Sequence, residues 1–229
     1  MFGYAASGWT GTNTGFPAVY GPLANSMRDL ILLTRVARDA KPWLMDPAII
    51  QHIFERGTLS RKPTVGILYQ SGKTPHPSIR RALREAVAKL RSAGFDIRDF
   101  VPPNFAEIKK VARQLFTLDG LSYPKREMEK AGEPVVVSVE KLGLWNLPPK
   151  KPEEIWEWNT RKLEIQKQIL DAWNKAGVDV VLCPAGPYTA VLPGDWTSEI
   201  YTVAWNAVDV NVLLITSLSH SIGADSRAS

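Results

Sequence analysis

Apolar residues recur along the chain in the short runs and helical spacings of alternating strands and helices. The run over 64–69 is apolar and predicts a strand buried on both faces. A helix is expected to begin at Pro77 and to end before Gly94, which suits a helix C-terminus. Residues 95–101 alternate apolar and polar side chains, as in a strand near a sheet edge. We therefore expect 64–101 to form a strand, a helix and a strand with a right-handed crossover.

Further periodic segments lie on both sides of this unit. Residues 178–183 form a second apolar run, which predicts another strand buried on both faces. The helix expected over 26–38 would bury one stripe, made of Leu30, Leu33, Thr34 and Ala37. The other expected elements are helices over 104–118 (capped by Asn104), 119–131, 153–175 and 197–208, a short helix after Asp46-Pro47, and a strand over 210–215.

The segments between these elements are expected to be loops. Residues 132–152 carry many prolines and predict a loop across the surface, and residues 1–24 predict an extended one. The small, polar tail 219–229 is expected to be disordered. No linker separates two cores, so residues 1–229 are interpreted as a single domain. Strands that alternate with helices predict an α/β layer architecture.

Charge and composition narrow the classes of partner. The net charge is +5, but basic and acidic residues are interspersed, and no nucleic-acid-binding motif accompanies them. We expect a solvated basic surface and no nucleic-acid partner. Cys183 is the only cysteine, which excludes an intrachain disulfide and a cysteine-rich metal site. No apolar run reaches the roughly 18 residues of a membrane span. The first residues lack a basic secretory leader, so a cytoplasmic location is expected.

The turn over 70–74 follows a predicted strand and precedes a predicted helix, as a phosphate-binding loop does. Gly66 and Gly72 are separated by five residues, whereas the two glycines of a phosphate-binding loop are separated by four, and nearby prolines remove N–H donors. This favours a simple polar turn, with a nucleotide site as an alternative. A catalytic pair of Ser71 and Lys73 is disfavoured, because side chains two residues apart in an extended turn point away from each other.

The remaining reactive or aromatic residues favour structural roles. The three histidines do not have the spacing of a metal site. Trp156, Trp158 and Trp173 fall on the helix expected over 153–175, where aromatic residues usually fill core volume. Cys183 follows an apolar run and is interpreted as a small buried hydrophobic residue. No metal or other cofactor is expected.

Six blocks of the sequence occur in the order and spacing of a known family. They are Gly21–Ser26 with Asp29-Leu30, Asp39–Trp43 with Asp46-Pro47, Val65–Leu68, the helix from Pro77 to Gly94, Asp179–Pro184, and Trp205–Asp209. Together they resemble the fungal-type branch of the amidase-signature family, which includes amidases and acetamidases. The resemblance covers roughly residues 8–209.

The resemblance implies a layered α/β/α fold with a mixed sheet, incomplete in this chain relative to the full amidase-signature fold. Members of the family hydrolyse the C–N bond of carboxylic amides through a Ser–cis-Ser–Lys triad, in a Gly/Ser-rich segment upstream of the Gly-Pro-Leu block. None of those motifs occurs here, and Ser7 lacks the family's Gly-Gly-Ser setting. We therefore expect the C-terminal portion of an amidase, truncated and without catalytic residues, whose full-length relatives act on small-molecule amides.

One candidate binding segment follows the second apolar run. Open α/β sheets place ligands at the carboxyl ends of their strands, which is where Pro184, Pro187 and Tyr188 are expected. With the resemblance, these residues become candidates for a substrate-binding wall, to which Tyr188 would contribute an aromatic face and a hydroxyl group. A simple turn is the alternative for this segment.

Two other functions remain open at this point. The chain could be a binding or interaction protein that reuses the α/β scaffold without hydrolysis, or a nucleotide-binding protein that uses residues 71–74. If strands that are apolar on both faces lack neighbours, the chain should also be marginally stable and prone to self-association.

Overall fold

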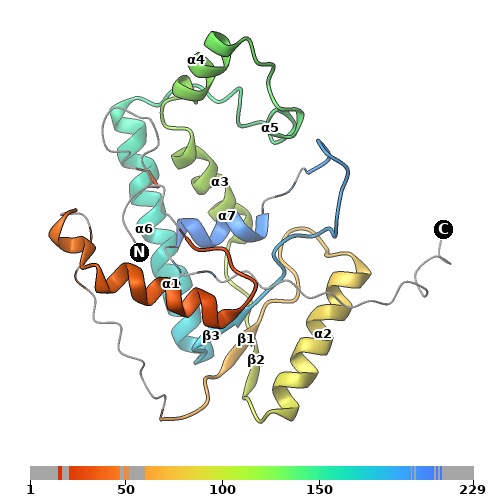
Figure 1. Cartoon of the computed structure of the whole chain (residues 1–229). Helices are drawn as coiled ribbons and strands as arrows, with labels where there is room; N and C mark the ends of the chain where they lie inside the picture. The colour runs from red at the N-terminus through yellow and green to blue at the C-terminus, as the bar shows by residue number, and fades with distance from the viewer. Residues whose placement is uncertain are drawn as a thin grey trace.

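The computed structural model describes residues 15–16, 21–46, 49, 51, 60–196, 198, 200–208, 210 and 212. Helices dominate these residues, and three short strands lie among them (Figure 1). In chain order the elements are α1 (Met27–Asp39), the 3-10 turn η1 (Pro42–Leu44), β1 (Val65–Ile67), α2 (Pro77–Ser92), β2 (Ile97–Asp99), α3 (Phe105–Phe116), α4 (Ser122–Ala131), α5 (Val137–Lys141), α6 (Pro152–Ala176), β3 (Val180–Leu182) and α7 (Ile200–Ala207).

The three strands form one sheet in the order β2-β1-β3. Both pairs are parallel, and Val65 of β1 is in register with Ile97 of β2 and with Val180 of β3. The strand–helix–strand unit predicted for 64–101 is confirmed, since β1 and β2 pair and α2 contacts β2. The predicted α/β class is also confirmed. The described strands are all parallel, however, so the mixed pairing expected for the sheet is not seen among them.

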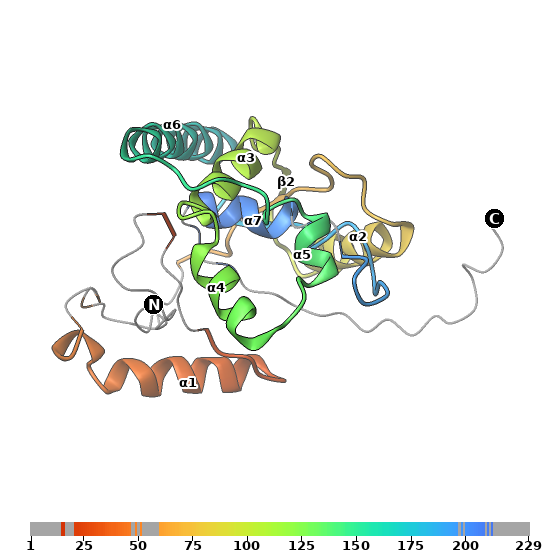
Figure 2. The same cartoon turned by 90° about the horizontal axis from the view of Figure 1, so that it is seen from above.

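Helices cover both faces of the sheet, because alternate residues of β1 point in opposite directions. Val65 and Ile67 pack against Leu83 and Val87 of α2. Leu68 joins the larger core with residues of α3, α6 and α7, and these helices lie on the side of the sheet away from α2 (Figure 2). The chain therefore has the α/β/α layering that the family resemblance implied.

The larger core is built around α3, which contacts both α6 and α7. The buried positions of α3 recur every three or four residues, as one face of an amphipathic helix requires; they are Phe105, Ile108, Val111, Ala112 and Leu115. Helix α7 is buried over most of its surface, and α6 contributes Ile165 and Ile169. Full burial of each large apolar side chain contributes about 1.5–3 kcal/mol, so this cluster is the main source of stability.

Several helix ends follow the predicted signals. The Ser26 hydroxyl accepts the Asp29 N–H at 3.2 Å and caps α1. Helix α6 begins at Pro152, and Gly177 ends it with φ at +60°, a left-handed conformation that glycine adopts at low cost. Asn104 does stand before α3, but its side chain donates to Gln168 Oε1 at 3.0 Å instead of capping the helix.

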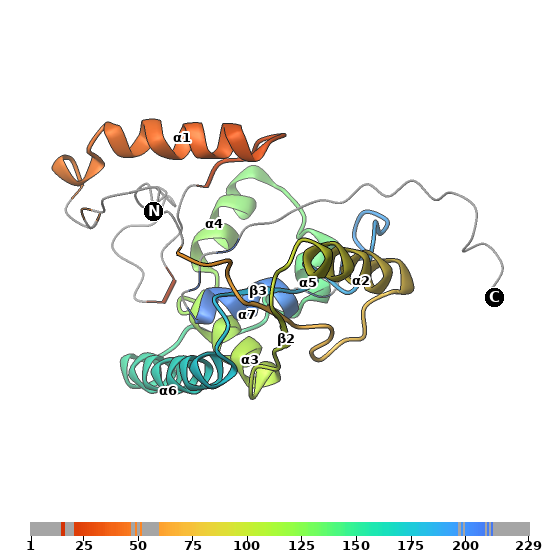
Figure 3. The same cartoon turned by 90° about the horizontal axis from the view of Figure 1, so that it is seen from below.

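Four further predictions differ from the structure. The expected loop 132–152 contains the short helix α5. Strand β3 is not buried on both faces, since Val180 is 45% exposed, and it lies at the edge of the sheet that the described strands form. The apolar stripe of α1 is not buried, and Leu33 is 50% exposed, because α1 lies along one side of the molecule, away from α6 (Figure 3). Trp158 and Trp173 pack against the larger core as expected, but Trp156 is 68% exposed.

Some expectations lie outside the described residues. They are the short helix after Asp46-Pro47, the strand over 210–215, the tail 219–229 and most of the loop 1–24. Within the described residues, no helix combines the length and apolarity needed to cross a bilayer.

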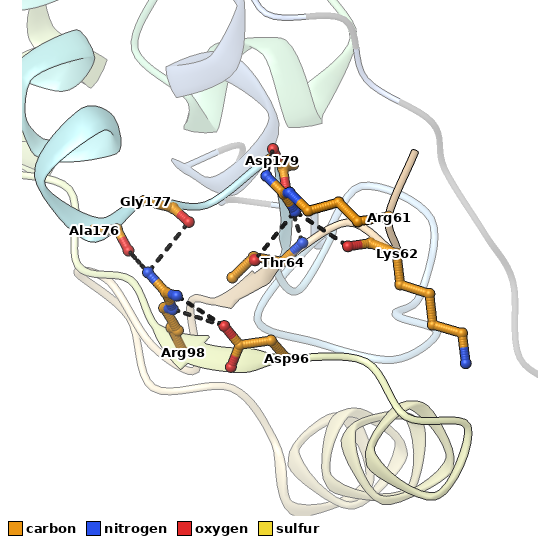
Figure 4. Close-up of polar contacts among 8 residues, drawn as sticks. All are labelled: Arg61, Lys62, Thr64, Asp96, Arg98, Ala176, Gly177 and Asp179. Atoms are coloured by element: carbon orange, nitrogen blue, oxygen red, sulfur yellow. Dashed lines mark hydrogen bonds and ion pairs between the residues drawn. The ribbon is translucent and has the colours of Figure 1, made fainter. Parts of the chain in front are cut away.

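A polar network holds the amino ends of the strands together (Figure 4). Arg61 donates to both carboxylate oxygens of Asp179, at 2.7 and 3.0 Å, and the Thr64 N–H donates to Asp179 Oδ2 at 2.7 Å. Arg98 donates to Asp96 and to the carbonyl of Ala176. These contacts join the segments that precede all three strands, which indicates a structural role for the amino ends of the strands.

Candidate functional site

Two loops meet at the carboxyl ends of the strands, where β1 and β3 end. Parallel pairing places the carboxyl ends of neighbouring strands side by side, so the segments that follow them start close together. The Leu68 N–H donates to the Leu182 carbonyl at 3.0 Å, which extends the pairing by one step. Further along, the His76 N–H donates to the Pro187 carbonyl at 2.8 Å and joins the two loops.

Tyr201 of α7 binds the backbone of the loop that follows β1. Its buried hydroxyl accepts the Ser71 N–H at 3.1 Å and donates to the Lys73 carbonyl at 2.7 Å. Burial raises the pKa of this phenol above its ordinary value. Between these two residues, Gly72 has φ at +76°, and a Cβ there would overlap the end of the Ile200 side chain. The turn therefore requires glycine and is fixed by the helix beneath it.

These bonds also bear on the phosphate-loop alternative. A phosphate cradle needs several consecutive N–H groups that point outward to the ligand. In this turn the Ser71 N–H bonds to Tyr201, and the Lys73 N–H donates to the Ser71 carbonyl at 3.0 Å. The geometry therefore favours the simple polar turn.

Lys73 and three aromatic rings lie close together at the loop that follows β3. The Lys73 ammonium donates to Tyr188 Oη at 2.8 Å and lies 5.4 Å from the centre of the Tyr188 ring. The His76 ring packs edge-on to Tyr188 at 5.3 Å between centroids, and the Trp196 ring does so at 6.3 Å. We call the group Lys73, His76, Tyr188 and Trp196 the Tyr188 corner.

Glycine at position 186 makes this packing possible. A Cβ on Gly186 would lie 2.7 Å from Cη2 of Trp196, closer than van der Waals contact allows. The loop backbone can therefore approach the indole ring directly.

The structure places the three predicted site residues on this loop, but in different environments. Pro184 and Pro187 are buried and shape the turn, whereas Tyr188 is partly exposed and touches the aromatic and cationic groups of the corner. Sequence reasoning did not assign His76 or Trp196 to a site, and it considered Lys73 only in the disfavoured pair with Ser71 and in the alternative nucleotide site. Parallel pairing of the two apolar strands would have brought the turn at 70–76 to the same edge, but Trp196 carries no such signal.

Cys183 lies at the start of the second loop and packs against the larger core. Burial raises the pKa of its thiol, which keeps it protonated at neutral pH and suits the predicted role as a small hydrophobic residue. Among the described residues, no group of three or more His, Cys, Asp or Glu side chains is arranged to hold a metal ion.

Two surface hollows lie against α3, and neither includes a member of the Tyr188 corner. One, of about 210 Å³, is lined by Ala106, Lys109, Lys110, Arg113, Gln114 and Leu147. The other, of about 320 Å³, is lined by Arg113, Phe116, Leu144, Thr202, Val203 and Asn206. Neither brings together a nucleophile and a base, so neither resembles a hydrolytic centre.

Known proteins resemble this chain over most of its length. It is 28% identical to an amidase of Gibberella moniliformis over 90% of the chain and 39% of that protein. It is 24% identical to an acetamidase of Emericella nidulans, over 86% of the chain and 39% of that protein. Among solved structures, a fatty acid amide hydrolase matches 82% of the chain and 34% of its own length, with a TM-score of 0.73 and 28% identity.

The chain thus spans about two fifths of the length of the curated relatives that it matches. The amidase family model matches residues 7–222, which include every described strand and helix. On this evidence the chain belongs to the amidase family.

Proposed function

We propose that this chain forms the substrate-wall portion of an amide hydrolase and does not hydrolyse amides by itself. Family membership supports the amide-hydrolase lineage, and two of the relatives are named amidase and acetamidase. The observation that carries the proposal is the Tyr188 corner, which stands at the carboxyl ends of parallel strands, where α/β folds place their ligands.

The lack of hydrolysis is argued from the residues that the chain contains. Acyl transfer by a serine needs a positioned base and oxyanion donors beside the nucleophile. The sequence contains no Gly-Gly pair, and hence no Gly-Gly-Ser setting for a serine. In the Ser71–Lys73 turn, the ammonium donates to Tyr188, and the Ser71 N–H is bonded to Tyr201. A pair that lacks both base contact and oxyanion donors cannot supply the barrier reduction of acyl transfer.

The wall is assigned to Tyr188, with Pro184 and Pro187 as the residues that shape its loop. Both prolines are buried, whereas the Tyr188 side chain is partly exposed and is the aromatic group that this loop offers to a ligand. An aromatic amide would pack its ring against Tyr188 and Trp196, since edge-to-face ring pairs are worth about 0.5–1.5 kcal/mol beyond their buried area.

Hydrolysis is tested by incubating the purified chain with acetamide and with an aryl amide, and by treating it with a fluorophosphonate. We expect no turnover above background and no time-dependent labelling of a serine. Labelling of one serine that also abolished amide turnover would refute the proposal.

The wall is tested by titration with benzamide, an uncharged aryl amide. The readout is the indole N–H resonance of Trp196, assigned by its loss in Trp196→Phe. We expect a saturable shift that Tyr188→Leu weakens and that the matched change Tyr123→Leu on α4 leaves intact. A titration without any shift of Trp196 would remove the wall from the proposal.

A further inference from the structure

Among the described residues, the Tyr188 corner contains a cation, Lys73, with no carboxylate within ion-pair distance. Some surface lysines pair with carboxylates, such as Lys130 with Glu127 and Lys141 with Asp195, both at 2.9 Å. The Lys73 ammonium instead contacts the neutral phenol of Tyr188, through its hydroxyl and over its ring.

This arrangement leaves binding capacity on Lys73. An ammonium group has three N–H donors, and Tyr188 Oη accepts one of them. Hydrogen bonds between an ammonium and a carboxylate are shorter and about twice as strong as neutral ones. A ligand carboxylate would therefore gain more at this position than the uncharged amide group of the same ligand.

The rings beside Lys73 favour a ligand that is flat and aromatic. His76 and Trp196 both stand edge-on to Tyr188, at interplanar angles of 67° and 89°. Their positions are held by the bond from the His76 N–H to Pro187 and by the close approach of Gly186 to the indole. The Tyr188 corner thus presents a preformed aromatic surface next to a cation.

We infer that the Tyr188 corner is a subsite for aromatic carboxylates, with the carboxylate on Lys73 Nζ and the ring against Tyr188 and Trp196. The inference rests on the proposed function, because it adds a charge preference to the wall assigned to Tyr188. An aromatic carboxylate is also the acid half of an aryl amide, so the subsite would favour the acid product of such a substrate over the amide.

The test compares benzoate with benzamide at low ionic strength, again through the indole resonance of Trp196. Because Lys73 is exposed, we expect benzoate to bind about two- to fivefold more tightly than benzamide, the range of an exposed ion pair. The advantage should shrink at high salt, which screens exposed charges. Cyclohexanecarboxylate, which has the charge without the aromatic ring, should bind more weakly than benzoate.

The variants separate the charge of Lys73 from general charge effects. Lys73→Gln should make benzoate and benzamide bind equally. Lys110→Gln is the matched control, because the Lys110 ammonium also lies over an aromatic ring, the indole of Trp158, at 5.7 Å from its centroid. It should leave the benzoate advantage unchanged.

Each negative result has its own meaning. If benzamide binds and benzoate binds no more tightly, or if the benzoate advantage survives in Lys73→Gln, the inference is wrong while the wall stands. Equal binding of cyclohexanecarboxylate and benzoate would refute the aromatic preference. If neither aromatic compound moves the Trp196 resonance, the wall proposed for Tyr188 fails, and this inference fails with it.

Discussion

Replacement of Tyr201 by Phe tests whether α7 fixes the turn that carries Lys73. The change removes one oxygen atom, which accepts the Ser71 N–H and donates to the Lys73 carbonyl. The ring remains, so its packing against Phe105 at 6.2 Å between centroids is preserved. The change therefore isolates two hydrogen bonds without opening a cavity of any size.

The magnitude follows from those two bonds. Each intramolecular hydrogen bond contributes about 0.5–1.5 kcal/mol net, and a buried partner left unsatisfied costs about 1–3 kcal/mol. The Ser71 N–H and the Lys73 carbonyl are partly buried, so water can replace part of what each loses. We expect Tyr201→Phe to lower the free energy of unfolding by about 1–3 kcal/mol.

The assay combines a global and a local measurement. Urea denaturation followed by circular dichroism gives the change in free energy of unfolding, and hydrogen exchange reports the protection of the Ser71 amide, which should fall in Tyr201→Phe. Tyr69→Phe is the matched control, because Tyr69 is exposed and its hydroxyl has no hydrogen bond among the described residues. If the two variants had the same urea midpoint and the same Ser71 protection, the role of the Tyr201 hydroxyl in fixing the turn would be refuted.

Three further outcomes are expected. Gly72→Ala should cost at least about 1–2 kcal/mol, measured as a lower urea midpoint, because φ there is +76° and the new Cβ would also displace the Ile200 side chain; an unchanged midpoint would contradict the requirement for glycine. The bond from Arg61 holds the pKa of Asp179 below its ordinary value. The ionised Asp179 carboxylate therefore stabilises the folded state above about pH 4, and this stabilisation is lost as pH falls through the folded-state pKa. The midpoint difference between the wild type and Asp179→Asn should therefore shrink in acid, and a constant difference would contradict this. The exposed stripe of α1 should promote self-association, so Leu33→Gln should weaken it about three- to tenfold by analytical ultracentrifugation, whereas Leu163→Gln on α6 should not; equal effects would remove α1 from the interface.

Most of the fold was predictable because its signals are local. The strand–helix–strand unit followed from an apolar run, a proline-led helix and a glycine at its end, and each signal acts within a few neighbouring residues. The short helix α5 was missed because its five residues lie in a proline-rich segment, where composition predicts a loop.

Burial was harder to predict than secondary structure. The residues of α1 have helical spacing and did form a helix, but periodicity shows only that one face is apolar, and it does not say what covers that face. The same holds for β3, whose apolar run predicted a strand buried on both faces, although Val180 is 45% exposed. Both differences concern long-range packing, which the sequence pattern alone does not contain.

The candidate site shows the same division between local and long-range information. Tyr188 could be chosen from the sequence because it follows a predicted strand, and the carboxyl ends of strands are where α/β folds place ligands. Its partners could not be chosen, because Lys73 lies 115 residues away and contacts it only when β1 and β3 are neighbours in the sheet. The register of that pair is therefore what creates the corner. A change that shifted the pairing of β1 and β3 should abolish the Lys73–Tyr188 contact even if every residue of the corner were retained.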